Sequence, residues 1–154
     1  MKTLKSLLLG AGAMMAMLTA CSGNATLTES GLEPAKFDTT INDKPVKLFV
    51  LKNAKAEVCV TNFGARVVSI AVPDKNGKLT DVVLGFDNIR EYADSVNTPS
   101  DFGAAIGRYA NRIGKGLITV DGKQIQLPTN NFGHCLHGGP SGWQYSVYEP
   151  VEQN

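Results

Sequence analysis

Three polar side chains in the last third of the chain have the chemistry to hold an oxygen-rich ligand. Arg112 carries a planar fork of donors that stays charged at any working pH. Asn111 beside it can both donate and accept hydrogen bonds. His137 follows 25 residues after Arg112 and precedes Gly138 and Gly139, which allow the backbone to approach a site closely. These residue types make Asn111, Arg112 and His137 candidates for a binding site, and residue type alone leaves a surface role open for them.

Simpler interpretations exist for the same stretch. Arg108 and Arg112, taken alone, fit a pair of surface charges, and for Arg108 we favour a structural role. His134, Cys135 and His137 could form a metal cluster, but a catalytic zinc needs about three protein ligands of compatible geometry. Neighbours on an extended strand point to opposite faces, so we expect no metal here.

We expect no binding or catalytic role for the aromatic and acidic residues that follow the histidine motif. Trp143 has the flat ring needed to stack on a ligand, although a core or edge aromatic is the role we favour. Glu149 and Glu152 are the carboxylates that follow His137, and we expect both to be solvated.

Short β-strands separated by turn residues must position these side chains. Apolar and β-branched runs predict strands, and helical periodicity is almost absent apart from one or two helical turns at 89–95. The predicted strands span 46–51, 57–62, 66–72, 81–86, 117–120, 124–127 and 145–149. Asn-Gly at 76–77 and Asp-Gly at 121–122 predict tight hairpins with positive φ angles. Several short strands of this spacing indicate one all-β domain, a sandwich or a barrel.

The N-terminal residues are typical of an export signal rather than of the folded domain. Lys2 and Lys5 precede an uncharged apolar run at 7–18, which is too short to span a membrane but fits a signal peptide. Leu-Thr-Ala-Cys at 18–21 resembles a bacterial lipobox, in which the cysteine receives the lipid. We therefore expect a signal peptide at 1–20, lipid attachment at Cys21, a tether at 21–34, and a lipid-anchored protein of the bacterial cell envelope.

Charge and cysteine content bear on two further questions, whether the protein binds nucleic acid and whether it contains a disulfide. Loss of Lys2 and Lys5 changes the formal net charge from +1 to −1, which gives no basic surface for nucleic acid. Export permits a disulfide between Cys59 and Cys135. Cys59 nevertheless alternates with valines in a strand-like run, so we favour buried free thiols.

An ordered series of motifs resembles the galactose mutarotase (aldose 1-epimerase) family. The series runs from Thr-Asn-Phe-Gly-Ala at 61–65 through Asp-Val-Val-Leu-Gly-Phe at 81–86, Phe-Gly-Ala-Ala-Ile-Gly-Arg at 102–108, Asn-Arg-Ile at 111–113, Asp-Gly-Lys at 121–123 and Asn-Asn at 130–131 to Leu-His-Gly-Gly at 136–139. The resemblance implies that Asn111 and Arg112 bind a free aldose, and that His137 contacts it near the ring oxygen and assists proton transfer there. No cofactor is implied.

The resemblance also implies a large antiparallel β-sandwich, of which residues 35–154 would be the N-terminal part. A second histidine as general acid and a glutamate as general base would follow Asn154. We therefore expect the 154-residue chain alone to be inactive as an isomerase. A partial sandwich would leave an apolar face and strand edges uncovered, which favours association.

Three alternatives to an aldose 1-epimerase stay open from the sequence. The first is a non-catalytic carbohydrate-binding module on the same fold. The second is a structural surface lipoprotein that binds no aldose. The third is a sugar-phosphate epimerase, which would be expected to carry a basic rim for the phosphate, and the near-neutral charge gives no sign of one.

Overall fold

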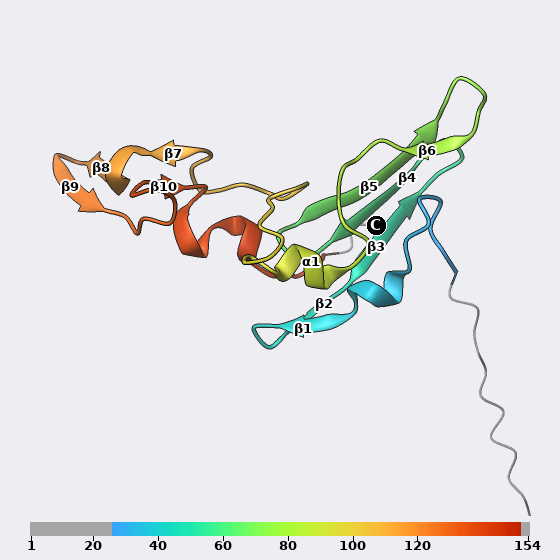
Figure 1. The fold of residues 1–154 in the computed structure, drawn as a ribbon, viewed down its shortest axis with the longest axis horizontal. Coiled ribbons are helices and arrows are strands. Elements are labelled where there is room, and N and C mark those ends of the chain that lie inside the picture. Colours follow the sequence, from blue (N-terminus) through green and yellow to red (C-terminus); the bar gives the residue numbers. More distant parts are fainter. Residues whose placement is uncertain (1–25, 152–154) are drawn as a thin grey trace, which may run out of the picture.

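A four-stranded antiparallel sheet forms the larger part of the molecule. The structure is a computed structural model that describes residues 26–151. The sheet has the order β3-β4-β5-β6 (Figure 1). Its strands are β3 (Leu48–Lys52), β4 (Glu57–Thr61), β5 (Arg66–Pro73) and β6 (Leu79–Asp81).

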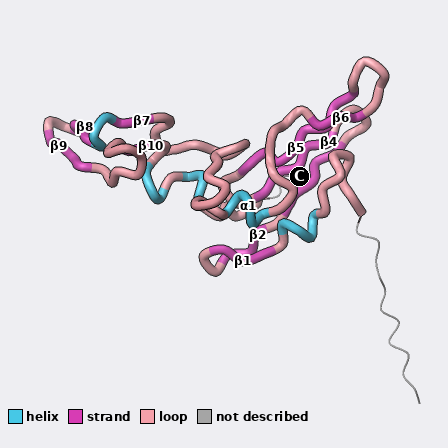
Figure 2. The backbone as a smooth tube through the Cα atoms, viewed as in Figure 1, coloured by secondary structure: helices cyan, strands magenta, loops and turns pink. Residues whose placement is uncertain are grey.

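The other strands of residues 26–151 form three two-stranded antiparallel ribbons. They pair β1 (Thr39–Ile41) with β2 (Lys44–Val46), β7 (Arg112–Ile113) with β10 (Cys135–Leu136), and β8 (Leu117–Val120) with β9 (Lys123–Gln126). The helical segments are η1 (Pro34–Phe37), α1 (Ile89–Ala93), η2 (Gly114–Gly116), η3 (Gly139–Ser141) and η4 (Trp143–Tyr145). Figure 2 shows that loops and short helical segments join the ribbons β7–β10 and β8–β9 to the four-stranded sheet.

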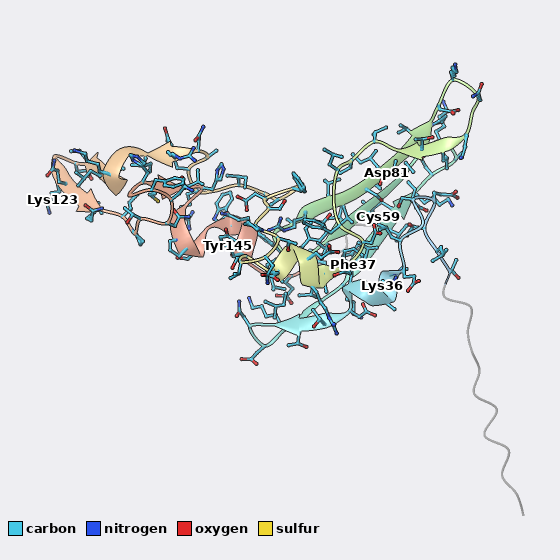
Figure 3. All side chains as sticks on the ribbon, viewed as in Figure 1. Lys36, Phe37, Cys59, Asp81, Lys123 and Tyr145 are labelled. Atoms are coloured by element: carbon cyan, nitrogen blue, oxygen red, sulfur yellow. The ribbon has the colours of Figure 1, made fainter. Side chains whose placement is uncertain are left out.

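The core lies between one face of the sheet and the segments η1 and α1. Phe37 and Cys59 are fully buried in it, with Tyr92 of α1 packed beside Phe37 at a ring-centroid distance of 6.4 Å. Figure 3 labels Phe37 and Cys59 together in this part and Lys123 at the far end of the β8–β9 hairpin. Burial of these apolar side chains supplies the main force that holds the sheet against the helices.

Strand β4 shows how the pattern of the sequence selects the buried face. Its inward residues are Glu57, Cys59 and Thr61, and the valines between them are half-buried on the other face. The buried Glu57 carboxylate has polar partners, since it accepts the backbone N–H of Glu29 and lies 3.6 Å from Lys52 Nζ. The alternation expected over 57–62 is therefore confirmed, with the polar members on the inside.

Several predicted elements are confirmed. The strand at 66–72 is β5, and the helical turns at 89–95 contain α1, which Asn88 caps by accepting the N–H of Glu91. The hairpin at 117–127 is β8–β9, and Asp121 and Gly122 have φ angles of 49° and 74° as predicted. The predicted strand at 46–51 is divided, since β2 ends at Val46 and β3 begins at Leu48.

Three other predictions are wrong in detail. The strand at 81–86 ends at Asp81, whose carboxylate accepts the N–H of Val83 and thereby turns the chain out of the sheet. Residues 145–149 form no strand: η4 ends at Tyr145, and Val147 makes an isolated bridge to Phe63. The turn after β5 is a longer loop, with positive φ at Gly77 and not at Asn76.

The all-β, antiparallel character predicted from the sequence is confirmed. Cys59 and Cys135 are buried free thiols in the structure. The predicted signal peptide, Cys21 and the first part of the tether lie outside residues 26–151, as does Glu152. Within that range, no helix is both long and apolar enough to cross a bilayer.

Candidate functional site

The pairing of β7 with β10 brings the two halves of the predicted site together. Arg112 lies opposite Leu136, and Ile113 lies opposite Cys135. Asn111 and His137 are the residues immediately beyond this short ladder, so the antiparallel register places them side by side. The structure thus joins all three predicted residues, which come from two separate motifs.

Asn111 and His137 hold each other through two hydrogen bonds. The backbone N–H of Asn111 donates to Nδ1 of His137 at 2.9 Å, and the backbone N–H of His137 donates to the carbonyl oxygen of Asn111 at 3.0 Å. Because Nδ1 accepts, the hydrogen of the neutral imidazole resides on Nε2. No partner for Nε2 is found among residues 26–151, so this N–H is available to an external acceptor.

The backbone at both positions has a conformation that ordinary residues seldom adopt. Asn111 has φ 63° and His137 has φ 52°, which lies in the sparsely populated left-handed region. Such conformations persist where surrounding contacts fix them, and they concentrate at binding and catalytic sites. Here the two reciprocal hydrogen bonds supply that constraint.

Arg112 is oriented by asparagines. Its Nε donates to Oδ1 of Asn131 at 2.9 Å, and its Nη1 makes a long contact of 3.4 Å with Oδ1 of Asn111. The side chain is exposed, and these contacts leave most of its terminal N–H groups available. Asn131 belongs to the motif at 130–131, but its sequence position gives no indication that it orients Arg112.

The site is closed from behind by a tight contact between Gly138 and Gly107. A Cβ at Gly138 would overlap the carbonyl oxygen of Gly107, and Gly138 has φ 83°. The same carbonyl accepts the N–H of Trp143 at 3.1 Å. A side chain at Gly138 would therefore separate the segment before Asn111 from the segment after His137.

Trp143 and Arg108 pack on each other at the edge of the site. The indole ring covers Gly107, and the Arg108 guanidinium lies 5.8 Å from the ring centroid, within cation–π range. Trp143 is 41% exposed. This geometry supports the edge-aromatic role for Trp143 and the structural role for Arg108.

A cavity of about 830 Å³ adjoins the site, a size that accommodates small-molecule ligands. Arg108, Tyr109, Arg112 and Trp143 contribute its polar and aromatic walls, and apolar residues of the β7–β10 region line the rest. Arg112 and Gly138 face this cavity, whereas Asn111 and His137 are not among its lining residues. Of the three predicted residues, only Arg112 therefore lines the cavity.

Two fully buried polar residues, Arg66 and Gln144, hold the backbone behind the site and were not predicted. The side chain of Gln144 donates from Nε2 to the carbonyl oxygen of His137 at 3.1 Å, and the backbone carbonyl of Gln144 accepts from Arg66 at 3.1 Å. Burial lowers the pKa of the Arg66 guanidinium from its ordinary value, while the charge of Asp101 opposes this effect. The sequence signals neither role, because polar residues of these types are mostly exposed.

The residues of the alternative metal cluster are engaged elsewhere. Nδ1 of His134 accepts the N–H of Lys115 at 3.0 Å, and the Cys135 thiol is buried. Residues 26–151 contain no group of three histidine, cysteine or acidic side chains placed to hold a metal ion. Glu149 is exposed.

Comparison with known proteins identifies relatives of one kind. The sequence model of the family described as aldose 1-epimerase matches residues 47–154. The galactose mutarotase of Bos taurus is 36% identical over 113 residues, which cover 73% of this chain and 32% of the relative. The aldose 1-epimerase of Escherichia coli K12 is 34% identical over 112 residues, which cover 72% and 32% of the two chains. The chain thus spans about a third of the length of these relatives.

Solved structures give the same result. The GalM/aldose epimerase homologue from C. elegans superposes with a TM-score of 0.65 at 37% identity, covering 71% of this chain and 33% of that one. The galactose 1-epimerase from Lactobacillus acidophilus NCFM superposes with a TM-score of 0.59 at 25% identity, covering 71% and 30%. The family model covers residues 47–154, which include Asn111, Arg112 and His137, and the sequence and fold comparisons agree with it. The chain therefore belongs to the aldose 1-epimerase family.

Proposed function

We propose that this chain provides the sugar-binding part of an aldose 1-epimerase that acts on a free hexose such as glucose or galactose. The observation that carries the proposal is the reciprocal pair of hydrogen bonds between Asn111 and His137, with Arg112 beside it. This pair fixes a directed N–H donor next to a permanent cation with free donors. The hydroxyl and ring oxygens of a sugar can accept hydrogen bonds from donors of both kinds.

Interconversion of α and β anomers proceeds through ring opening. A base removes the proton of the anomeric hydroxyl while an acid protonates the ring oxygen. The C1–C2 bond then rotates, and the aldehyde recloses on its other face. In our proposal Nε2–H of His137 donates to the sugar near the ring oxygen, where negative charge develops. Arg112 donates to neighbouring oxygens and holds the ring in one orientation.

Proton transfer in both directions requires two further groups. The resemblance assigns these to a second histidine and a glutamate, and the histidines of the 154-residue chain are His134 and His137. His134 already accepts a backbone N–H through Nδ1. We therefore propose that the 154-residue chain binds aldoses without accelerating their mutarotation.

Two measurements on the purified chain test this proposal. NMR titration with D-glucose and D-galactose should move the signals of residues 111–113 and 136–139, and His137→Ala should abolish the effect while His134→Ala retains it. Polarimetry of α-D-glucose should give the relaxation rate of buffer alone. Absence of binding by the wild type would overturn the binding role, and a rate well above that of buffer would overturn the assignment of the acid and base elsewhere.

We also propose that the chain is exported and anchored to the bacterial cell envelope through a lipid on Cys21. The basic start, the apolar run at 7–18 and the Leu-Thr-Ala-Cys box support this proposal. Cells expressing the wild type should incorporate labelled palmitate into the protein, and Cys21→Ala should lose the label. Cys59→Ala is the matched control, and equal labelling of the Cys21 variant would contradict the anchor.

A further inference from the structure

Gln144 is a fully buried amide that holds the backbone of His137 from behind. Its Nε2 donates to the carbonyl oxygen of His137 at 3.1 Å, and the side chain has no exposed surface. Gly142 lies against the same contact, since a Cβ there would overlap both the His137 carbonyl oxygen and Oε1 of Gln144. The carbonyl, the amide and Gly142 therefore form one closely packed turn.

Arg66 fixes Gln144 to the four-stranded sheet. Its Nη2 donates to the backbone carbonyl oxygen of Gln144 at 3.1 Å, and its Nη1 donates to the backbone carbonyl oxygens of Ser100 and Phe102 at 3.2 Å each. The guanidinium also lies 5.3 Å from the ring centroid of Phe63. Among residues 26–151 no carboxylate lies within salt-bridge distance of it, so backbone carbonyls take the role of counter-charge.

This arrangement connects the two segments that carry the site. The carbonyls of Ser100 and Phe102 belong to the segment that leads to Asn111, and Gln144 belongs to the segment that follows His137. The Arg66 guanidinium on β5 thus hydrogen-bonds to the backbone of both segments. The Asn111–His137 hydrogen bonds join the same two segments at the site.

We propose that Gln144, held by Arg66, is a positioning residue that sets the backbone of His137 and thereby keeps its imidazole in the Nε2–H form. Gln144 does not contact the ligand. Its amide fixes the His137 carbonyl, and this fixes the ring at the distance where Nδ1 accepts from Asn111. The consequence for aldose binding rests on the proposed function, whereas the consequence for the ring does not.

The ring itself provides the test. The chain has two histidines, so ¹⁵N-labelled histidine gives a spectrum in which His137 is assigned by its loss in His137→Ala. At about pH 8, above the ordinary imidazole pKa, the wild type should show one dominant tautomer with the hydrogen on Nε2. Gln144→Met keeps the length of the side chain and removes the donor, and it should give an average of both tautomers at His137 alone. Gln124→Met, the same change at an exposed position of β9, should leave the spectrum unchanged.

Affinity provides a second measurement. Gln144→Met should raise the dissociation constant for D-galactose about tenfold, as expected for loss of one hydrogen bond that orients a donor. Gly142→Ala retains the Gln144 amide and the His137 carbonyl but pushes them apart. If Gln144→Met lowers the folded population, Gly142→Ala replaces it in the test, with the same rise of about tenfold in the dissociation constant expected. A His137 tautomer unchanged in both variants would overturn the positioning role. An averaged tautomer with unchanged affinity for D-galactose would support the positioning role and overturn its consequence for aldose binding. If the wild type binds no aldose, the proposed function fails, and the tautomer comparison still decides the positioning role.

Discussion

His137 contacts the backbone of Asn111 with both its imidazole and its own backbone N–H. The imidazole accepts a backbone N–H, so the direct hydrogen-bond partner of Nδ1 of His137 is a peptide group rather than another side chain. A peptide N–H cannot change its protonation near neutral pH, and the assignment of Nε2 as donor is therefore independent of pH in the neutral imidazole. The site thus gains a directed donor whose orientation a peptide group fixes.

Substitution of Arg112 by lysine should weaken aldose binding. Lysine keeps the charge but loses the planar fork and the Nε donor to Asn131. We expect the dissociation constant for D-galactose to rise about tenfold, equivalent to about 1.4 kcal/mol, in an NMR titration. Arg90→Lys, at an exposed position of α1, is the matched control, and an equal affinity of both variants would refute the role of the fork.

The thiol of Cys59 should make stability depend on pH. Burial raises the pKa of this thiol, with a smaller opposing effect of its hydrogen bond to Ser69. The folded protein therefore retains the proton at a pH where the unfolded chain has released it. Its contribution to stability is fully present below the unfolded thiol pKa of about 8.5 and is lost as the pH rises toward the folded pKa.

Urea denaturation between about pH 7.5 and 9.5 measures this effect. The free energy of unfolding of the wild type should fall across this range, and that of Cys59→Ala should fall less because the titrating group is gone. Both proteins retain Cys135, so their difference isolates Cys59. Burial also raises the pKa of Tyr92, but its contribution changes only above about pH 10. Parallel pH profiles would contradict the prediction.

At the scale of elements, loops rather than long strands carry the site. Strands β7 and β10 have two residues each, and a ladder of this length is too short to be stable by itself. Its register is fixed from outside by amide side chains: Asn130 both donates to the carbonyl oxygen and accepts the N–H of Leu136, at 3.1 and 2.7 Å. The Gly138–Gly107 contact and the Arg66 hydrogen bonds add further constraints.

Replacing Arg66 by lysine should destabilise the fold. An ammonium group has no planar fork to reach the three carbonyls that Arg66 serves on two segments. At least one of these buried carbonyls would lose its partner, so we expect the free energy of unfolding to fall by about 2–4 kcal/mol. Urea denaturation of Arg66→Lys against Arg90→Lys measures this, and a difference within about 0.5 kcal/mol would contradict it.

The whole molecule has one sheet face that is left largely uncovered by residues 26–151. Leu51 on the edge strand β3 lies opposite the half-buried Val58 on this face and is 63% exposed. A cavity of about 870 Å³ lies beside Leu51 and is lined also by Phe49, Val60, Ala65 and Tyr148. An apolar face beside an unpaired strand edge favours association between chains.

A charge on this face should therefore reduce self-association of the chain. We expect wild-type protein to show concentration-dependent sedimentation, and Leu51→Lys to shift it toward the monomer, because a lysine on an edge strand opposes pairing. Val96→Lys places the same charge on an exposed loop residue and should sediment as the wild type does. Equal behaviour of both variants would show that this face does not mediate association.

Local patterns account for the parts of the fold that the sequence could predict. Alternation predicted β4, an apolar run predicted β5, and Asp-Gly predicted the β8–β9 hairpin, because each depends on neighbouring residues. The strand expected at 81–86 ended early for a local reason, since the Asp81 carboxylate accepts the N–H of Val83 two residues later. The strand expected at 145–149 failed for a non-local reason, because Val147 bridges to Phe63 through a contact that no short window of sequence contains.

The sequence by itself determined the chemistry of the site: Asn111, Arg112 and His137 follow from residue type and motif, and the family follows from their order. Only the tertiary structure decided which atom of His137 donates, and that Arg66 and Gln144 lie buried behind it. Arg66 and Gln144 are 78 residues apart. Whether a polar side chain is buried depends on distant segments packing around it, and the residue's own neighbours in sequence carry no record of that packing.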